Sequence, residues 1–201
     1  MSSIVLASAS PRRHALMKQI NLDCIVHPAD IDESRTRWTT PDTYTLELSS
    51  RKADAIAGKF ADHLIIAADT VVSFEDTYLN KPESEQEAFD YLKTLSSRTH
   101  QVTTGVTLVD TGHQQKHQFF VITNVTFDAL EDEDIRAYIA TGSPMDKAGA
   151  YGIQDDWGAI FVSEIHGDYY NVVGFPLNRF FRELRTFAPR FLPRPLSTNT
   201  N

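Results

Sequence analysis

The acid Asp69 stands inside a run of apolar residues. Residues 64 to 72 read LIIAADTVV, a nearly continuous apolar run typical of a strand covered on both faces. An unpaired carboxylate buried there would cost several kcal/mol or be forced to take up a proton. An acid in this position usually binds a metal, pairs with a base or takes part in catalysis, with a structural ion pair as the alternative.

A second candidate is the segment Ser8 to Arg13, SASPRR, which follows a short apolar strand. Ser10 suits a helix N-cap and Pro11 the first helical position. Backbone N–H groups at such a helix start favour an anion, and two arginines strengthen the site. Because neighbouring helical residues point about 100° apart, Arg12 and Arg13 are not expected to line one pocket wall together, which leaves a packing role open for one of them. The alternative is a capped helix with solvated arginines.

Two lysines and one loop complete the candidates. Lys52 falls on the apolar stripe of a predicted helix, where a ligand contact competes with a lysine that merely extends its ammonium to water. Lys81 precedes Pro82, which favours an extended, accessible backbone. The loop from Asp146 to Gln154, DKAGAYGIQ, combines glycines, charges, an aromatic ring and an amide, a mixture suited to a planar ligand, although a polar surface loop is the alternative.

The overall composition restricts the partners. The 201 residues carry a formal net charge of −8, which disfavours nucleic acid and anionic membranes as partners. An anionic ligand must therefore meet a local cluster of positive charge. The single cysteine, Cys24, excludes an intramolecular disulfide and fits a reducing compartment, so we expect the cytoplasm. No apolar run approaches the ~18 residues of a membrane helix.

The pattern of elements predicts one α/β domain over residues 1–188 and a disordered tail over 189–201. Strands and helices alternate early and hairpins dominate later, so we expect a mixed twisted sheet with flanking helices, in two lobes around a central cleft. The predicted strands are residues 3–7, 64–72, a hairpin of 101–109 with 118–127, and a hairpin of 160–165 with 169–173. The predicted helices begin at Ser10, Thr40, Ser84, Glu131 and Pro176.

Several segments together resemble one family, the Maf proteins, over about residues 4 to 185 and in consistent order. They are LASASPRR (6–13), IDE (31–33), Lys52, AADTVV (67–72), Asn80-Lys81-Pro82, Thr99-His100-Gln101-Val102, DKAGAYGIQ (146–154), and the pattern of Gly167 to Tyr170, Val172 to Gly174 and Pro176. Each motif is uncommon by chance, which makes the resemblance specific.

The resemblance implies a fold similar to the inosine-triphosphate pyrophosphatases, usually a homodimer, that hydrolyses nucleoside triphosphates between the α and β phosphates with a divalent cation, Mg²⁺ or Mn²⁺. It implies that Asp69 is the catalytic proton acceptor and that Glu33 and Asp69 bind the metal. The ending Tyr-Gly-Ile-Gln resembles the branch that acts on dTTP and UTP. The implied phosphate contacts are Ser8, Ser10, Arg12, Arg13, Lys52 and Lys81, and the implied specificity residues are Arg12, Thr70 and Gln154.

Two other functions remain open at this point. A regulator of septum formation would bind nucleotide without significant turnover and would need no activated carboxylate. A nucleic-acid-binding factor is disfavoured by the net charge and by the lack of a basic face. A nucleotide pyrophosphatase agrees best with the residues, because such a reaction needs charge neutralisation, a positioned water and little else from the protein.

Overall fold

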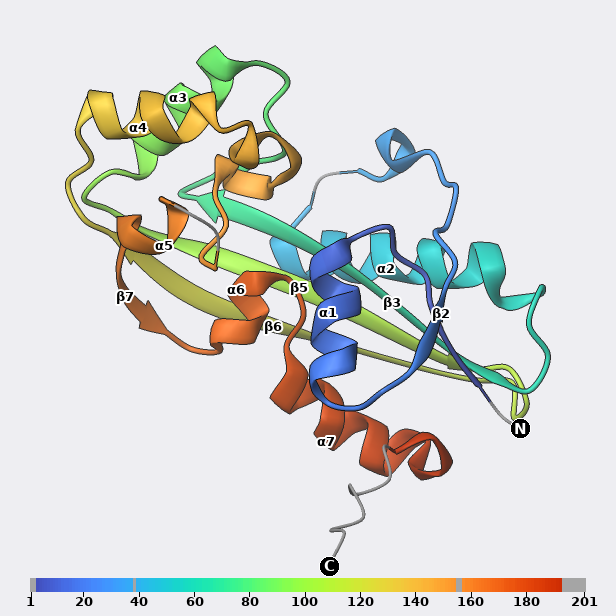
Figure 1. Ribbon diagram of the computed structural model, residues 1–201. Helices are drawn as coiled ribbons and strands as arrows, with labels where there is room; N and C mark the ends of the chain where they lie inside the picture. Colours follow the sequence, from blue (N-terminus) through green and yellow to red (C-terminus); the bar gives the residue numbers. More distant parts are fainter. Residues whose placement is uncertain (1–2, 38, 155–156, 193–201) are drawn as a thin grey trace, which may run out of the picture.

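The computed structural model describes residues 3–37, 39–154 and 157–192 (Figure 1). The strands are β1 (Ser3–Leu6), β2 (Cys24–Val26), β3 (His63–Phe74), β4 (Thr77–Leu79), β5 (Thr99–Asp110), β6 (Gln115–Phe127) and β7 (Val162–His166). The α-helices are α1 (Pro11–Gln19), α2 (Pro41–Ala57), α3 (Glu85–Leu95), α4 (Asp132–Ala140), α5 (Gly158–Phe161), α6 (Tyr169–Val173) and α7 (Leu177–Phe187). Short 3₁₀ turns are η1 (Glu33–Arg35), η2 (Ser143–Asp146), η3 (Ala148–Ala150) and η4 (Pro189–Phe191).

The described strands form one mixed sheet, in the order β2-β1-β3-β5-β6-β7 with β4 paired to β3. Strand β1 runs parallel to β2 and β3, and the other pairs are antiparallel. The mixed α/β sheet with flanking helices predicted from the sequence is therefore confirmed, as is the first hairpin, which is slightly longer than predicted.

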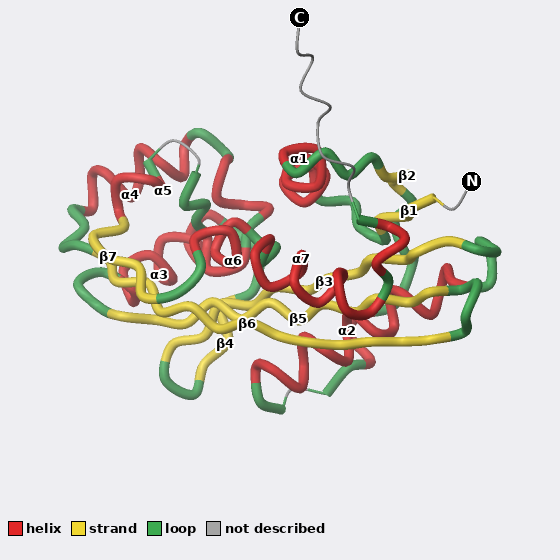
Figure 2. Tube along the Cα trace, turned by 90° about the horizontal axis from the view of Figure 1, so that it is seen from below, coloured by secondary structure: helices red, strands yellow, loops and turns green. Residues whose placement is uncertain are grey.

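Helices cover both faces of the long strands. Helix α2 lies on one face, and α1 and α7 lie on the other (Figure 2). In Figure 1, β1, β2 and α1 gather toward one end of the molecule and α3, α4, α5 and β7 toward the other, while β3, β5 and β6 run through both. This arrangement agrees with the expectation of two lobes. Most of the core packs between α1, α3, α4, α7 and one face of the sheet.

Helix α2 approaches the sheet closely at one glycine. A Cβ on Gly105 of β5 would lie 2.5 Å from the backbone carbon of Thr45, so only glycine leaves room for the helix here. Gly105 pairs with Asp69 in the neighbouring strand β3. Lys52 follows Thr45 by seven residues, or about two helical turns, and therefore shares its face of α2. The close packing at Gly105 thus brings Lys52 over the strand that carries Asp69.

The second predicted hairpin is wrong. Residues 169–173 form helix α6, and β7 pairs with β6 instead of with a following strand. Gly167, at φ +140°, turns the chain, and Asp168 then caps the helix by accepting hydrogen bonds from the backbone N–H groups of Tyr170 and Asn171. The apolar residues that suggested a strand are those of a short capped helix, because the cap chemistry prevails over their β propensity.

The chain stays packed beyond the predicted domain boundary at residue 188. Pro189–Phe191 forms the turn η4, Phe191 is buried, and Arg190 pairs with Asp62 and Asp110 at 2.8 and 2.7 Å. The expected disorder is therefore wrong for residues 189–192, where one aromatic ring and one ion-pair network hold the chain. Residues 193–201 of the predicted tail lie outside the described part. No helix among the described residues is long and apolar enough to span a membrane.

Candidate active site

A cleft of about 990 Å³ opens where the loop after β1, the middle of β3 and the segment after α4 meet. All ten residues singled out from the sequence border it, namely Ser8, Ser10, Arg12, Arg13, Glu33, Lys52, Asp69, Thr70, Lys81 and Gln154. Among the described residues, six cationic and three acidic side chains line the cleft, which are Arg12, Arg13, Arg37, Lys52, Lys81 and Lys147 against Glu33, Asp69 and Asp146. The cleft is thus locally positive in a protein of net charge −8, and it suits an anionic ligand.

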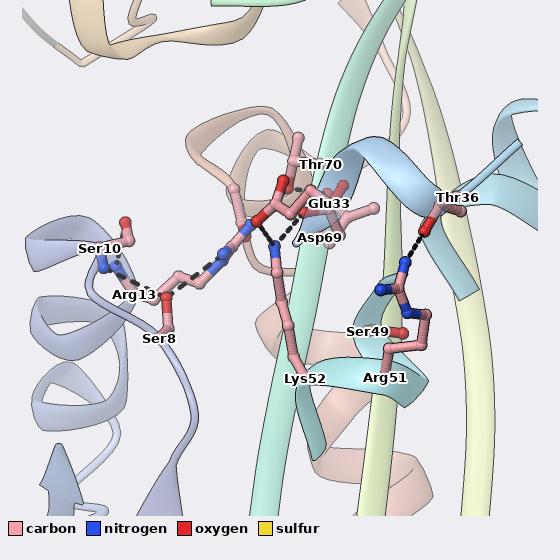
Figure 3. Close-up of polar contacts among 12 residues, drawn as sticks. Ser8, Ser10, Arg13, Glu33, Thr36, Ser49, Arg51, Lys52, Asp69 and Thr70 are labelled. Atoms are coloured by element: carbon pink, nitrogen blue, oxygen red, sulfur yellow. Dashed lines mark hydrogen bonds and ion pairs between the residues drawn. The ribbon is translucent and has the colours of Figure 1, made fainter. Parts of the chain in front are cut away.

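The buried acid Asp69 pairs with Lys52. The Lys52 Nζ lies 2.6 Å from the Asp69 Oδ1 and 2.9 Å from the Glu33 Oε1, so one ammonium joins two carboxylates (Figure 3). The side chains of Lys52 and Asp69 are 13% and 12% exposed, whereas that of Glu33 is 53% exposed. Lys52 therefore does not simply extend its charge into water. Of the three side chains, Glu33 is the one exposed to solvent, whereas Lys52 and Asp69 are largely buried.

Burial raises the pKa of Asp69 above its ordinary value, while Lys52 and Arg13 act in the opposite direction. A carboxylate with a raised pKa is a better proton acceptor near neutral pH than an exposed one. Nearby Tyr44 also lines the cleft, and burial together with the charges of Asp69 and Glu33 raises its pKa to about 12, so its hydroxyl remains a neutral hydrogen-bond donor. Burial thus makes Asp69 the candidate proton acceptor of the cleft.

Arg13 reaches toward the same place from the start of α1 (Figure 3). Its guanidinium donates to the Gly174 carbonyl from Nε at 2.9 Å, to Ser8 Oγ from Nη1 at 3.3 Å and to Thr70 Oγ1 from Nη2 at 3.0 Å. Ser10 caps the helix by accepting from the Arg13 N–H, and Pro11 is the first helical residue, as predicted. The start of α1, an end of a helix that favours anions, therefore borders the cleft and carries a fixed arginine.

Thr70 lies on the opposite face of β3 from Asp69, because successive strand residues alternate. Its hydroxyl lies 2.9 Å from that of Thr104 and 3.4 Å from the Gly174 carbonyl. Gly174 ends α6 at φ +119°, a conformation that favours glycine. Thr70 thus holds the guanidinium of Arg13 directly, by accepting its hydrogen bond, and also contacts the Gly174 carbonyl to which Arg13 donates.

Arg12 and Arg13 have different partners, yet both border the cleft. Arg12 Nη1 lies 3.1 Å from Asp146 Oδ2, and Asp146 also pairs with Lys147 at 2.7 Å. This bridge joins α1 to the segment that ends at Gln154. Gln154 and Lys81 are exposed at the cleft edge, and within the described part of the chain neither side chain makes a hydrogen bond or an ion pair. Both are therefore available to a ligand.

Glu33 is held in place by its neighbours. Asp32 caps the turn η1 by accepting from the Ser34 N–H at 3.2 Å, and the Arg51 side chain on α2 donates to the Asp32 carbonyl at 2.8 Å and to the Thr36 hydroxyl. The turn that carries Glu33 is thereby attached to α2 one residue before Lys52. This explains how an exposed loop residue reaches the buried pair.

The donor set agrees with a divalent cation. The ammonium of Lys52 contacts Glu33 and Asp69 at once, so a single cation can meet both carboxylates. Mg²⁺ is commonly held by one or two carboxylates together with substrate phosphate oxygens. Over residues 3–37, 39–154 and 157–192 no cluster of three or more histidine, cysteine or acidic residues could hold a metal by itself. The residues fit a cation that binds together with a phosphate ligand.

Sequence reasoning missed some of the residues that border the cleft. Tyr44 and Arg37 border the cleft, although neither belongs to a motif that pointed to a ligand. Lys147 lies within the loop of residues 146–154, and its side chain is 8% exposed and donates from Nζ to the Ser143 carbonyl at 2.5 Å. A charged residue between two glycine-containing turns was the available signal for Lys147.

The chain was compared with known proteins. A family model described as "Maf-like protein" matches residues 3–187. The dTTP/UTP pyrophosphatase of Carboxydothermus hydrogenoformans is 47% identical over 185 residues, which cover 92% of this chain and 98% of that protein. The dTTP/UTP pyrophosphatase of Bacillus cereus strain ATCC 10987 is 42% identical over 187 residues, which cover 93% and 91%. The solved structure of the Staphylococcus aureus Ham1 protein is 17% identical, covers 63% of this chain and 72% of that one, and has a TM-score of 0.43. With the family model spanning nearly all described residues, this chain belongs to the Maf family.

Proposed function

We propose that this protein is a nucleoside triphosphate pyrophosphatase that hydrolyses dTTP and UTP to the monophosphate and pyrophosphate. The observation that carries the proposal is the buried acid Asp69 in contact with Lys52 and beside Arg13, at the floor of a positively charged cleft. The names of the curated relatives, which are aligned over more than nine tenths of the chain, support the same reaction and the same substrates.

In this mechanism Asp69 accepts the proton of the attacking water. The water oxygen forms a bond to the α-phosphorus as the bond to the bridging oxygen breaks, and pyrophosphate leaves. Burial, which raises the pKa of Asp69, favours this proton transfer near neutral pH. Lys52 orients the carboxylate through the bond from its Nζ to Oδ1 and leaves the second oxygen of Asp69 for the water.

The phosphates are neutralised by groups that are already in position. Arg13 is fixed by three hydrogen bonds, the N-terminus of α1 borders the cleft with its partial positive charge, and Lys81 is exposed at the cleft edge. We assign Ser8 and Ser10 to this region because they shape the turn into α1. Glu33 and Asp69 would hold a divalent cation, which when bound adds charge neutralisation at the phosphates.

The choice of base is assigned to Gln154, with Arg12 and Thr70. An amide can donate to a pyrimidine carbonyl and accept from the ring N–H, and a purine presents these groups differently. The Gln154 side chain is exposed at the cleft edge and has no hydrogen bond to any of the described residues, which supports this role. Thr70 acts through Gly174 and Arg13, given its hydrogen bonds. We further propose a cytoplasmic homodimer, in line with the family resemblance and the free Cys24.

The test is a nucleotide screen for released pyrophosphate. The full chain is incubated with dTTP, UTP, ATP, GTP and 7-methyl-GTP, each with Mg²⁺, with Mn²⁺ and with excess chelator. We expect one pyrophosphate per monophosphate from dTTP and UTP, little from the purines and none with chelator. Tight nucleotide binding with no release under any condition would contradict the proposal and favour the nucleotide-binding regulator. A preference for 7-methyl-GTP would contradict only the choice of base.

A further inference from the structure

A histidine outside the proposed reaction lies beneath the loop that carries Gln154. His100 on β5 is 1% exposed, and its ring makes edge-on contacts with the rings of Phe127 and Tyr151 at centroid distances of 4.9 and 5.3 Å. It belongs to the Thr99-His100-Gln101-Val102 segment, to which the proposed mechanism gives no task. A buried histidine in an apolar cluster needs a reason, because an apolar residue of similar size would pack there at lower cost.

The only hydrogen bond of the His100 ring among the described residues joins Nε2 to the Tyr151 hydroxyl at 2.8 Å, and Nδ1 is buried without a partner there. Burial lowers the pKa of His100 to about 3, so the ring is neutral at physiological pH and contributes no charge to the cleft. The specific contribution of His100 is therefore its hydrogen bond to Tyr151. The fold keeps this bond although burial of the unbonded Nδ1 costs free energy.

Tyr151 connects this bond to the cleft. It is 5% exposed, borders the cleft and stands three residues before Gln154. The backbone around it is held separately, by the Gly149 N–H to the Asn80 carbonyl at 3.2 Å and by the Gly152 N–H to the Tyr138 hydroxyl at 3.1 Å. Gly149 itself requires glycine, since it has φ +71° and a Cβ there would lie 2.9 Å from a Val72 methyl. The backbone bonds fix the path of the loop, while His100 fixes the ring of Tyr151, a residue that borders the cleft.

We propose that His100 is a positioning residue for nucleotide selection, which acts through Tyr151 to set the wall against which the base is aligned with Gln154. The inference rests on the proposed function of the cleft. His100 touches neither the substrate nor the reacting atoms. Removing the His100–Tyr151 bond should therefore loosen the alignment of the base. The chemical step at Asp69 should stay largely intact, because His100 takes no part in the ion pair of Lys52 and Asp69.

The experiment compares wild type with His100→Phe, His100→Gln, Tyr151→Phe and the double variant His100→Phe/Tyr151→Phe. Phenylalanine keeps an aromatic ring but cannot form the bond, and the glutamine amide, which can donate or accept, can restore a hydrogen-bonding group near the position of Nε2. For each protein, kcat and KM are measured on UTP and GTP, dissociation constants for both are measured by calorimetry, and Tm is recorded.

We expect His100→Phe and Tyr151→Phe each to lower the preference for UTP over GTP about tenfold or more, mainly through KM and Kd for UTP, with kcat within about threefold of wild type. The double variant should be no worse than either single variant, because both remove the same bond. His100→Gln should recover most of the preference. A folded His100→Phe with wild-type preference, or a double variant whose losses add, would overturn the inference.

Two outcomes separate this inference from the proposed function. If wild type binds UTP in preference to GTP but releases no pyrophosphate, the proposed function fails, while the binding constants of the variants still test His100. If wild type is active and selective but the variants are unchanged, only the inference fails. Tyr151→Phe removes the same bond and preserves the core ring, so it decides the matter if His100→Phe does not fold.

Discussion

Acid should destabilise this protein through His100 at a pH where ordinary exposed carboxylates are still ionised. The folded pKa of about 3 lies below the ordinary value of 6.5, so the unfolded chain binds the proton more readily. The stability due to the neutral ring is fully present above pH 6.5 and is lost as the pH falls toward 3. At pH 5 the free energy of unfolding is about 2 kcal/mol lower than at neutral pH, because each of the 1.5 pH units below 6.5 costs about 1.36 kcal/mol. This figure holds for any folded pKa well below 5.

The assay is urea unfolding of wild type, His100→Phe and Tyr151→Phe at pH 7.5 and pH 5.0. Between the two values, wild type should lose about 2 kcal/mol more of its free energy of unfolding than His100→Phe, which has no ring to protonate. Other titrating groups are common to the two proteins, so their effect cancels in the difference. Tyr151→Phe keeps His100 and should retain the acid sensitivity. Parallel losses in wild type and His100→Phe would refute the reasoning.

Three further substitutions test how the site is built. Lys81→Ala should lower kcat/KM at least tenfold, a loss of about 1.4 kcal/mol of transition-state stabilisation, with Tm unchanged. The surface control Lys116→Ala should leave the activity intact, and equal activities of the two variants would contradict a phosphate contact by Lys81. Gly105→Ala should lower the free energy of unfolding by about 1–3 kcal/mol and should also lower kcat, because it displaces α2 and with it Lys52. The control Gly58→Ala, at a position with open space around it, should change neither quantity, and a fully active, stable Gly105→Ala would show that the close approach of α2 is not needed. Gln154→Ala should erode the preference for dTTP and UTP over purines more than it lowers kcat, as compared with Gln86→Ala on the surface of α3, and an unchanged preference would contradict the assignment of Gln154.

Much of the site could be predicted because its signals are local. Asp69 contrasts with its apolar strand, and Ser10 and Pro11 mark a helix start whose geometry the structure reproduces. The motifs then grouped ten residues that the fold does bring to one cleft. Helix capping and strand burial depend on nearby residues, so the sequence alone contains the information.

What could not be predicted depends on contacts between distant segments. The sequence does not reveal that Lys52 pairs with both Asp69 and Glu33. Nor does it reveal that the Gly174 carbonyl accepts a hydrogen bond from Arg13, 161 residues earlier in the chain. The false hairpin at residues 169–173 has the same origin, because the apolar residues suit a strand until Asp168 caps them into a helix. Packing of α2 at Gly105 likewise becomes visible only when β5 and α2 are in place.

The central claim is that Asp69 is the proton acceptor of a pyrophosphatase, and one comparison tests it most directly. Wild type, Asp69→Asn and the control Asp54→Asn, an exposed acid on α2, are assayed for pyrophosphate released from UTP, with Tm as the check of folding. Asparagine keeps the shape of the side chain but cannot accept the proton, so turnover should fall by about 10² to 10⁴ in Asp69→Asn and stay at the wild-type level in Asp54→Asn. A folded Asp69→Asn protein that releases pyrophosphate at close to the wild-type rate would contradict the account.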